Sequence, residues 1–167
     1  RENKIPILGI CYGMQLMVVE FARNVGRLKG AHTTEVSPKT PYNIVDILPE
    51  QKEKLKQKDY GGSMRLGAYK AKVEKDTIAF DSYGREIISE RHRHRYEVNY
   101  DFVKQLQEKG MVFSCKSPDG KLMEIVELPE NIHPFFLGAQ FHPEFKSRPL
   151  DPHPLFLKFI ETAIKDR

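Results

Sequence analysis

Cysteine is scarce in this chain of 167 residues, and tryptophan is absent. The two cysteines, Cys11 and Cys115, lie too far apart in the sequence to suggest a disulfide framework, so we expect free thiols in a reducing compartment and a cytoplasmic protein. No apolar run approaches the length that crosses a bilayer, and no signal-peptide pattern is present. These absences predict a protein that is neither embedded in a membrane nor held together by disulfides.

A long block of basic residues is also missing, although lysine and arginine (27) outnumber aspartate and glutamate (23). We interpret the net charge of +4 as favouring solubility rather than nucleic-acid binding. A composition of 40% hydrophobic and 30% charged residues is ordinary for a soluble globular protein, and the chain is long enough to bury one sizeable core. We therefore expect one domain.

The most informative segment is Gly9–Gly13, which closes an apolar run at Ile5–Leu8 and opens a helical pattern at Met14–Val25. A strand, a glycine-flanked cysteine and a helix form the cysteine version of the nucleophile elbow, in which a sharp turn presents a nucleophile at the edge of an α/β sheet. The sulfur of Cys11 would lie at a helix N-terminus, where we expect the dipole and free N–H groups to lower the thiol pKa. A buried structural cysteine is the alternative, so a base must be found.

A candidate base follows a second apolar run, Phe135–Ala139, in the form of His142. Pro143 disfavours helical backbone at the preceding residue, so we expect an extended strand end on which His142 and Glu144 project the same way. Both Cys11 and His142 would then lie at the carboxyl ends of strands, where sites collect in doubly wound α/β proteins. His142 alone could be a core or turn histidine, but the combination predicts a Cys–His–Glu triad.

Around these residues the chain resembles the class I (triad) glutamine amidotransferases, in Gly9–Gln15 (GICYGMQ) and in Gln140–Glu144 (QFHPE). More narrowly, it is similar to the glutaminase domains of CTP synthases. That narrower resemblance rests on four further stretches in the family's order: Glu20–Val25 (EFARNV), Gly61–Gly67 (GGSMRLG), Glu90–Asn99 (ERHRHRYEVN) and Phe145–Phe156 (FKSRPLDPHPLF). Together the stretches cover almost the whole chain.

The resemblance implies a mechanism. Cys11 as thiolate attacks the side-chain carboxamide of L-glutamine, and the backbone N–H of Tyr12 meets the oxyanion. His142 moves the proton to the leaving ammonia and then activates water against the thioester, while Glu144 orients the imidazole. The residues that the resemblance implies for glutamine binding are Tyr12, Gly13, Met14, Gln15, Glu35, Arg95 and Tyr96.

Two substitutions depart from the family pattern, and Ile132 lies in what looks like a small insertion before His133–Pro134, which we expect in a surface turn. Tyr12 stands where leucine is more frequent, and its side chain would narrow the glutamine pocket while its backbone N–H is retained. Ser63 replaces the more usual threonine and keeps the hydroxyl. Neither change touches the predicted triad.

The implied fold is α/β, of the flavodoxin-like class I amidotransferase type, with a doubly wound, mostly parallel sheet flanked by helices. Because the elbow comes so early and the first residue is Arg1, we expect the N-terminal strands to be missing from this chain. Residues 1–167 would then be one glutaminase domain that lacks its N-terminal part and the glycine-rich loop that supplies one oxyanion-hole donor.

The resemblance also implies partners. The family's synthetase domain, absent here, binds UTP, ATP and Mg and uses the ammonia to make CTP, with GTP as activator and a homotetramer as the full-length enzyme. No cofactor is implied for this chain. No metal site is expected either, because the histidines lack the company and spacing of zinc ligands.

The run Arg91–Arg95 (RHRHR) could instead grip phosphate or single-stranded nucleic acid. On a strand, however, its arginines and histidines fall on opposite faces, and Glu90 and Glu97 weaken the local field. We therefore predict no nucleic-acid role. The resemblance implies that Arg95 holds the α-carboxylate of glutamine, for which a planar guanidinium is suited.

Two other kinds of protein stay open. A stand-alone γ-glutamyl hydrolase or amidase would share the triad but lack GGSMRLG and RHRHRYE, which are present. A non-catalytic assembly module would be indicated by the loss of a triad residue.

The rest of the chain predicts alternating elements. We expect a polar loop at Ala31–Asp59, with a solvated loop or short helix at Glu50–Lys58, and a turn at Asp81–Gly84. Further helices are expected at Tyr100–Lys109 and Pro154–Lys165. Strands are expected at Met64–Val73, Glu86–Tyr96, Met111–Lys116 and Leu122–Leu128.

Overall fold

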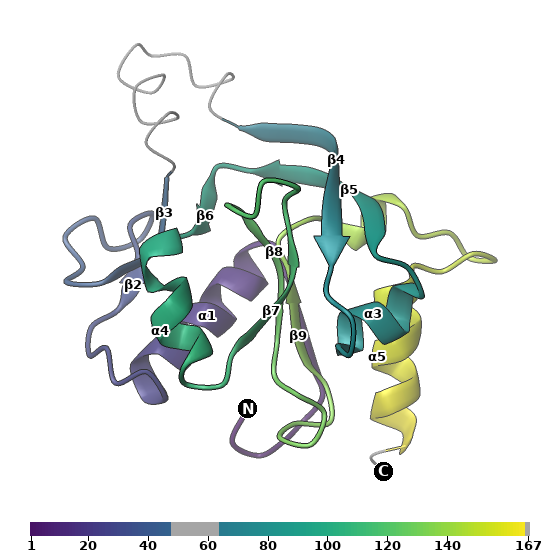
Figure 1. Ribbon diagram of the computed structural model, residues 1–167, viewed down its shortest axis with the longest axis horizontal. Helices are drawn as coiled ribbons and strands as arrows, with labels where there is room; N and C mark the ends of the chain where they lie inside the picture. Colours follow the sequence, from purple (N-terminus) through teal and green to yellow (C-terminus); the bar gives the residue numbers. More distant parts are fainter. Residues whose placement is uncertain (48–63, 166–167) are drawn as a thin grey trace.

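The computed structural model describes residues 1–47 and 64–165 (Figure 1). Their strands form two sheets. The larger sheet contains, in spatial order, β1 (Ile7–Ile10), β9 (Phe136–Ala139), β8 (Met123–Glu127), β7 (Val112–Lys116), β4 (Arg65–Val73) and β5 (Ile87–His94). The smaller sheet contains β2 (His32–Thr33), β3 (Asn43–Ile47) and β6 (Tyr96–Val98).

The larger sheet is mixed, which corrects the expectation of a mostly parallel sheet. Among its described strands β1 and β9 are parallel, whereas β9–β8, β8–β7, β7–β4 and β4–β5 are antiparallel. For β7–β8 and β8–β9 the cause is the length of the connections, because these strands follow one another through short links and a short link joins only antiparallel neighbours. The parallel pair β1–β9 is the part of the sheet that positions the site.

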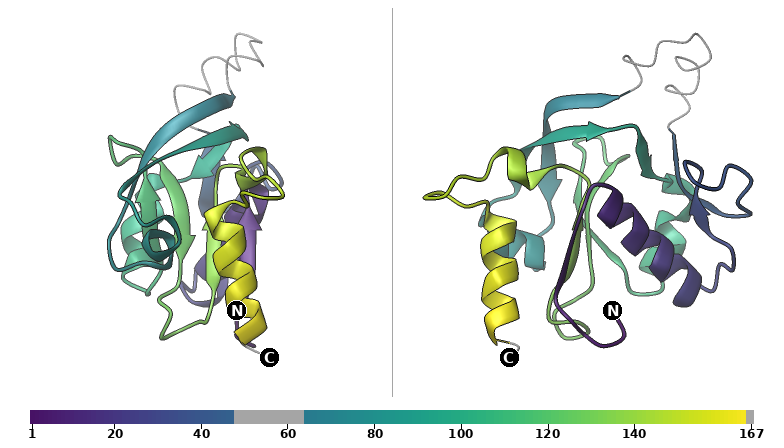
Figure 2. Two further views of the ribbon diagram at one scale, coloured as in Figure 1. Left: turned by 90° about the vertical axis from the view of Figure 1, so that its right-hand side faces the viewer. Right: turned by 180° about the vertical axis from the view of Figure 1, so that it is seen from behind.

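Helices pack against both faces of the larger sheet, as the doubly wound prediction requires. In Figure 1, α1 (Tyr12–Asn24) and α4 (Val103–Gln107) lie on one side of β7–β9, and α3 (Ile78–Tyr83) and α5 (Pro154–Lys165) on the other. Neighbouring residues on a strand serve different faces, since Phe136 packs in the α1 and α4 core and Leu137 in the α3 and α5 core. Figure 2 shows the same arrangement from two further sides.

Helix α3 replaces the predicted turn at Asp81–Gly84. A six-residue helix is marginal by itself, because nucleation costs more than so few hydrogen bonds return. Here the buried carboxylate of Glu127 accepts the first-turn N–H groups of Ile78 at 2.7 Å and Ala79 at 3.1 Å. Thr77 caps the N-terminus and Gly84, with φ of 63°, ends the helix. Glu127 lies on β8, so local sequence reasoning could not find this support.

The smaller sheet was also missed, because β2 and β3 fall within the predicted loop Ala31–Asp59. Strand β3 pairs with β6, far along the chain, so its partner is not a local one. The predicted strand Glu86–Tyr96 divides at Arg95 into β5 and β6, which belong to different sheets. The predicted segment Glu50–Lys58 and the start of the GGSMRLG motif, Gly61–Ser63, lie outside the described residues.

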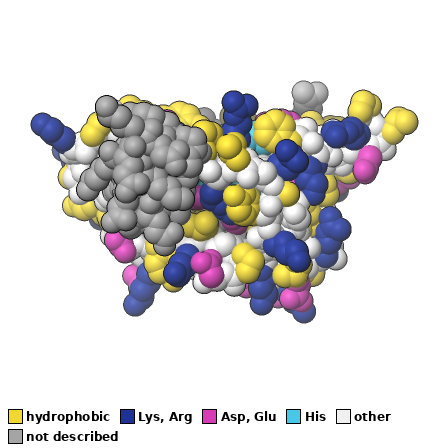
Figure 3. Space-filling view, turned by 90° about the horizontal axis from the view of Figure 1, so that it is seen from above, with side chains coloured by type: hydrophobic (Ala, Val, Ile, Leu, Met, Phe, Trp, Pro, Cys, Tyr) yellow, Lys and Arg dark blue, Asp and Glu magenta, His cyan; other side chains and the backbone are white. Residues whose placement is uncertain are grey.

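The visible surface agrees with the dispersed charge of the sequence. Seen from above, lysine and arginine side chains are spread among hydrophobic and acidic ones rather than gathered in one block (Figure 3). None of the helices in the described ranges has both the length and the apolar character that crossing a bilayer demands.

Candidate active site

Cys11 lies at the junction between β1 and α1, as the elbow pattern predicts. Its φ of 52° and ψ of −106° fall in a region that residues other than glycine seldom adopt. The backbone holds it there on both sides, since the Cys11 N–H donates to the carbonyl of Ala139 at 2.7 Å and the Cys11 carbonyl accepts from the N–H of Gln15 at 3.2 Å. Strain of this kind, held by surrounding hydrogen bonds, is typical of a nucleophile elbow.

Two glycines let α1 approach the parallel strands closely. A Cβ atom on Gly138 of β9 would lie 2.9 Å from the Cβ of Met14 and 3.0 Å from its Cα. A Cβ atom on Gly9 of β1 would lie 2.9 Å from the carbonyl carbon of Gly13. Side chains at these positions would push the helix away, so the glycines keep the start of α1 against the sheet.

His142 and Glu144 follow β9 at the same end of the sheet. The backbone of His142 is extended, with its N–H donating to the carbonyl of Arg91 at 2.9 Å, but the chain then turns into a short 3-10 helix, η2 (Pro143–Phe145). The predicted pair does face each other, because Nδ1 of His142 is 2.6 Å from Oε1 of Glu144. The ring of Phe145 stacks on the imidazole of His142, with 5.1 Å between the two ring centroids. Glu144 thereby engages Nδ1 and leaves Nε2 for another group.

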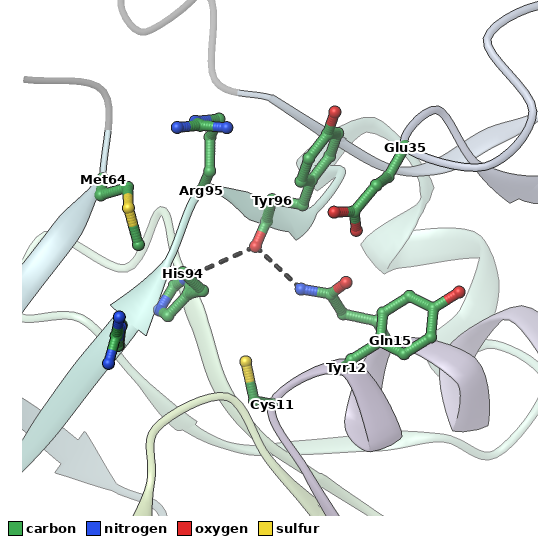
Figure 4. Close-up of a pocket in the computed structure, with 9 residues that line it drawn as sticks. Cys11, Tyr12, Gln15, Glu35, Met64, His94, Arg95 and Tyr96 are labelled. Atoms are coloured by element: carbon green, nitrogen blue, oxygen red, sulfur yellow. Dashed lines mark hydrogen bonds between the residues drawn. The ribbon is translucent and has the colours of Figure 1, made fainter. Parts of the chain in front are cut away.

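A cavity of about 330 Å³ opens beside Cys11. Figure 4 shows the sulfur pointing into it between His94 and Gln15. The residues that line the cavity are Cys11, Tyr12, Gln15, Glu35, Met64, Arg93, His94, Arg95 and Tyr96.

Most of the predicted glutamine-binding residues line this cavity, with two exceptions. Gly13 and Met14 do not, and Met14 is fully buried under Gly138. His142 and Glu144 are not among the lining residues either, so the structure does not place the predicted base in the wall of this cavity. The extra lining residues are Met64, Arg93 and His94.

Sequence reasoning missed Arg93 and His94 because it treated Arg91–Arg95 as one strand. The predicted alternation does hold in β5, where Arg91 and Arg93 are exposed and His92 and His94 are buried. The strand ends at His94, however, and the chain bends at Arg95 into the other sheet. Residues of both faces therefore reach the same cavity.

His94 also belongs to a ring of buried side chains, which we call the buried network: Arg65, His92, His94, Glu97 and Glu124. Arg65 donates to Glu124 at 2.9 Å and to Glu97 at 3.3 Å. Nδ1 of His92 lies 2.8 Å from Nε2 of His94. The ring closes because Nε2 of His92 lies 3.5 Å from Oε2 of Glu124, and Nδ1 of His94 lies 3.5 Å from Oε1 of Glu97. Its members come from β4, β5, β6 and β8, so the network ties the two sheets together.

Burial sets the protonation of this network. It raises the pKa of Glu97 to about 8 against the opposing charge of Arg65, and it raises the pKa of Glu124 as well. Burial, with the charge of Arg65, lowers the pKa of His92 to about 2 and that of His94 to about 3. At neutral pH both histidines are therefore neutral, and Glu97 holds a proton.

This protonation predicts a pH-dependent stability. The folded state keeps a proton that Glu97 releases near its ordinary pKa of 4.5 when unfolded, so the free energy of unfolding falls as the pH rises toward 8. The histidines act in the opposite sense only below their ordinary pKa of 6.5. Between pH 6.5 and about pH 8 we expect Glu97→Gln to make the decline in the free energy of unfolding shallower by about 1 kcal/mol per pH unit. Urea unfolding at a series of pH values measures it, and equal slopes in both proteins would contradict the assignment.

The thiol pKa of Cys11 differs from the expectation. Burial raises it, the backbone hydrogen bond from Tyr12 lowers it, and the carboxylates of Glu144, Glu35 and Glu97 raise it further. The net direction is upward, which corrects the prediction of a lowered pKa. The helix N-terminus does act in the predicted sense, but desolvation outweighs it.

The structure also describes the second thiol, Cys115, and the side chains that could hold a metal ion. Both cysteines are free, and Cys115 is buried in the core, where burial raises its thiol pKa. Across residues 1–47 and 64–165, no group of three or more histidine, cysteine, aspartate or glutamate side chains is arranged to hold a metal ion.

The structure places a strained cysteine between a strand and a helix, and a histidine–carboxylate pair after the neighbouring parallel strand. The family model of class-I glutamine amidotransferases matches residues 1–162. The chain belongs to this family, and the predicted α/β fold class is confirmed.

The chain is similar to several CTP synthases. The chain is 55% identical over 165 residues to the CTP synthase of Bacillus subtilis (strain 168), and 55% identical over 165 residues to that of Staphylococcus aureus (strain NCTC 8325). Each match covers 99% of this chain but only 30% of the length of the relative. The solved Trypanosoma brucei CTPS glutaminase domain with bound acivicin is 37% identical, with a TM-score of 0.90, over 99% of this chain and 62% of that one.

Proposed function

We propose that the chain is the glutaminase part of a CTP synthase, which hydrolyses L-glutamine through a thioester on Cys11 and supplies ammonia for the ATP-dependent amination of UTP to CTP. The observation that supports this most is the strained position of Cys11 at the edge of a cavity lined by Glu35 and Arg95. The similarity to CTP synthases along almost the whole chain supports the assignment to that enzyme.

The proposed chemistry follows the site. The Cys11 thiolate attacks the carboxamide carbon of glutamine, and the backbone N–H of Tyr12 at the start of α1 donates to the oxyanion. His142 takes the thiol proton and passes it to the leaving nitrogen, which departs as ammonia. Glu144 holds Nδ1, so Nε2 carries the transferred proton. Water, deprotonated by His142, then hydrolyses the thioester to glutamate.

Charge assigns the amino-acid end of the substrate. Arg95 offers a planar guanidinium to the α-carboxylate, and Glu35 offers a carboxylate to the α-ammonium. Tyr12, Gln15 and Tyr96 supply the remaining walls. In this proposal the final members of the predicted set, Gly13 and Met14, act through the backbone by fixing the start of α1.

The proposal makes the chain one part of a longer enzyme. Strand β1 is an edge of the larger described sheet, and a hollow of about 680 Å³ runs along it. Ile5 and Leu16 line this hollow with 64% and 42% of their surface exposed. An apolar edge strand with unpaired backbone groups suits a further strand. We propose that upstream strands of the same domain cover it and bring the second oxyanion donor.

The other parts of the proposed enzyme lie outside this chain. An upstream synthetase domain would bind UTP, ATP and Mg, with GTP as activator, in a homotetramer. Cytoplasmic placement suits the two free thiols, one of which must stay reduced to act.

The test is CTP formation by the complete enzyme with either glutamine or ammonia as nitrogen source. The proposal expects CTP from both, with glutamate released in equal amount when glutamine is used. Glutamine hydrolysis without CTP from either source would identify a stand-alone amidase. CTP from ammonia but never from glutamine would indicate a non-catalytic module.

A further inference from the structure

Gln140, the first residue after β9, has no role in the chemistry described so far. It is fully buried, and its side-chain nitrogen lies 3.8 Å from the sulfur of Cys11. Its side-chain oxygen accepts a hydrogen bond of 3.2 Å from Nε2 of Gln15, which is itself only 2% exposed. The same Gln15 nitrogen donates to the carbonyl of Tyr96 at 2.9 Å (Figure 4). A continuous chain of hydrogen bonds thus links β6 to the sulfur.

The direction of this chain is set at its far end. The Tyr96 carbonyl can only accept hydrogen bonds, so Gln15 must present its NH₂ group there. Nδ1 of His94 lies 3.1 Å from the same oxygen and occupies its other side. The second hydrogen of the Gln15 NH₂ group points to Gln140, which must present oxygen to it. Gln140 is therefore left with its own NH₂ group facing Cys11.

We propose that Gln140 is a catalytic residue that donates a side-chain N–H to the Cys11 sulfur and stabilises its thiolate, with Gln15 as the positioning residue that fixes this orientation. The inference rests on the proposed function for the identity of the nucleophile. The sulfur would then have two neutral donors, the backbone N–H of Tyr12 after β1 and the side-chain N–H of Gln140 after β9.

Such a donor would offset the surroundings of Cys11, which disfavour its thiolate. The titratable and charged groups around the sulfur are the acidic Glu35, Glu97 and Glu144 and the basic Arg93, Arg95, His94 and His142. The acidic groups disfavour the thiolate wherever they are ionised. Burial also disfavours the thiolate. A neutral N–H favours the charged form of a thiol without adding a charge that must itself be desolvated.

The experiment is the pH dependence of Cys11 alkylation by iodoacetamide, read by peptide mass mapping. We expect Gln140→Met, which keeps length and removes the donor, to raise the apparent pKa of Cys11 by about one unit and slow alkylation near neutral pH about tenfold. Gln140→Leu carries the same test if the methionine variant does not fold. Gln140→Glu, which adds a charge, is expected to raise the pKa further. Gln107→Glu, the same change on an exposed part of α4, is the control and is expected to leave the profile unchanged.

The outcomes separate this inference from the proposed function. A folded Gln140→Met protein with the parental alkylation profile would overturn the role of Gln140, even if the parent hydrolyses glutamine. Conversely, a shifted profile supports the hydrogen bond whether or not glutamine is the substrate. A variant that is less stable but has an unshifted pKa would show that Gln140 serves packing alone.

Discussion

Replacing Cys11 with alanine is expected to abolish glutamine-dependent CTP formation by the complete enzyme while ammonia-dependent formation stays intact. The nucleophile forms the covalent bond to the substrate, and removal of such a group typically costs about 10⁴-fold or more. Ammonia supplied directly needs no thioester, so the synthetase reaction does not depend on the thiol. Initial rates of CTP formation with each nitrogen source measure both effects.

Cys115→Ala is the matched control, because it removes the other thiol, which is buried in the α3 and α5 core and does not line the cavity. It is expected to keep both activities at near-parental rates. Glutamine-dependent synthesis that survives Cys11→Ala would refute the triad, and loss of both activities in that variant would mean that Cys11 acts in folding rather than in chemistry.

The second large effect concerns the buried network. We expect Arg65→Met to lower the free energy of unfolding by about 3–5 kcal/mol, the usual cost of leaving a buried carboxylate, here Glu124, without its partner. Arg65 donates to both Glu97 and Glu124, and it is the one cation of the network whose charge is fixed. Without it the Glu124 carboxylate loses its cation and the protonated Glu97 loses a hydrogen-bond donor, so only neutral histidines remain beside them in the ring. Urea unfolding at neutral pH measures the loss.

The loss is also expected to shrink in acid. Without Arg65 the pKa of Glu124 rises further, so the penalty is greatest where Glu124 would ionise and falls as it becomes protonated. Arg85→Met, on an exposed turn, is the control and is expected to change stability by less than about 0.5 kcal/mol. A neutral-pH loss in Arg65→Met no larger than in this control would show that the network does not hold the fold.

The elbow and the histidine–carboxylate pair could be predicted because their causes are local. Glycines around Cys11, apolar runs before Cys11 and His142, and Pro143 all act within a few residues, and the structure has each element where these residues indicate. The pairing of His142 with Glu144 is likewise a contact of near neighbours. The triad itself, as a catalytic unit, remains a prediction.

What could not be predicted depends on contacts between distant segments. Gln140 stands in a recognised motif, yet its approach to Cys11 arises only from the β1–β9 register that pairs Ile10 with Ala139. Arg65 and Glu124 meet the histidines only after strands far apart in sequence are paired. The thiol pKa was predicted in the wrong direction for the same reason, because burial is a property of the whole fold.

The most direct test of the central claim is covalent labelling with a diazo-ketone analogue of glutamine, followed by intact mass and peptide mapping. We expect one adduct, on Cys11, whose formation free glutamine slows and which never appears on Cys115. The same adduct, formed faster, is expected in the polypeptide extended upstream to include the proposed oxyanion loop. Labelling at another residue, labelling that glutamine does not slow, or no labelling of the extended polypeptide would contradict that claim.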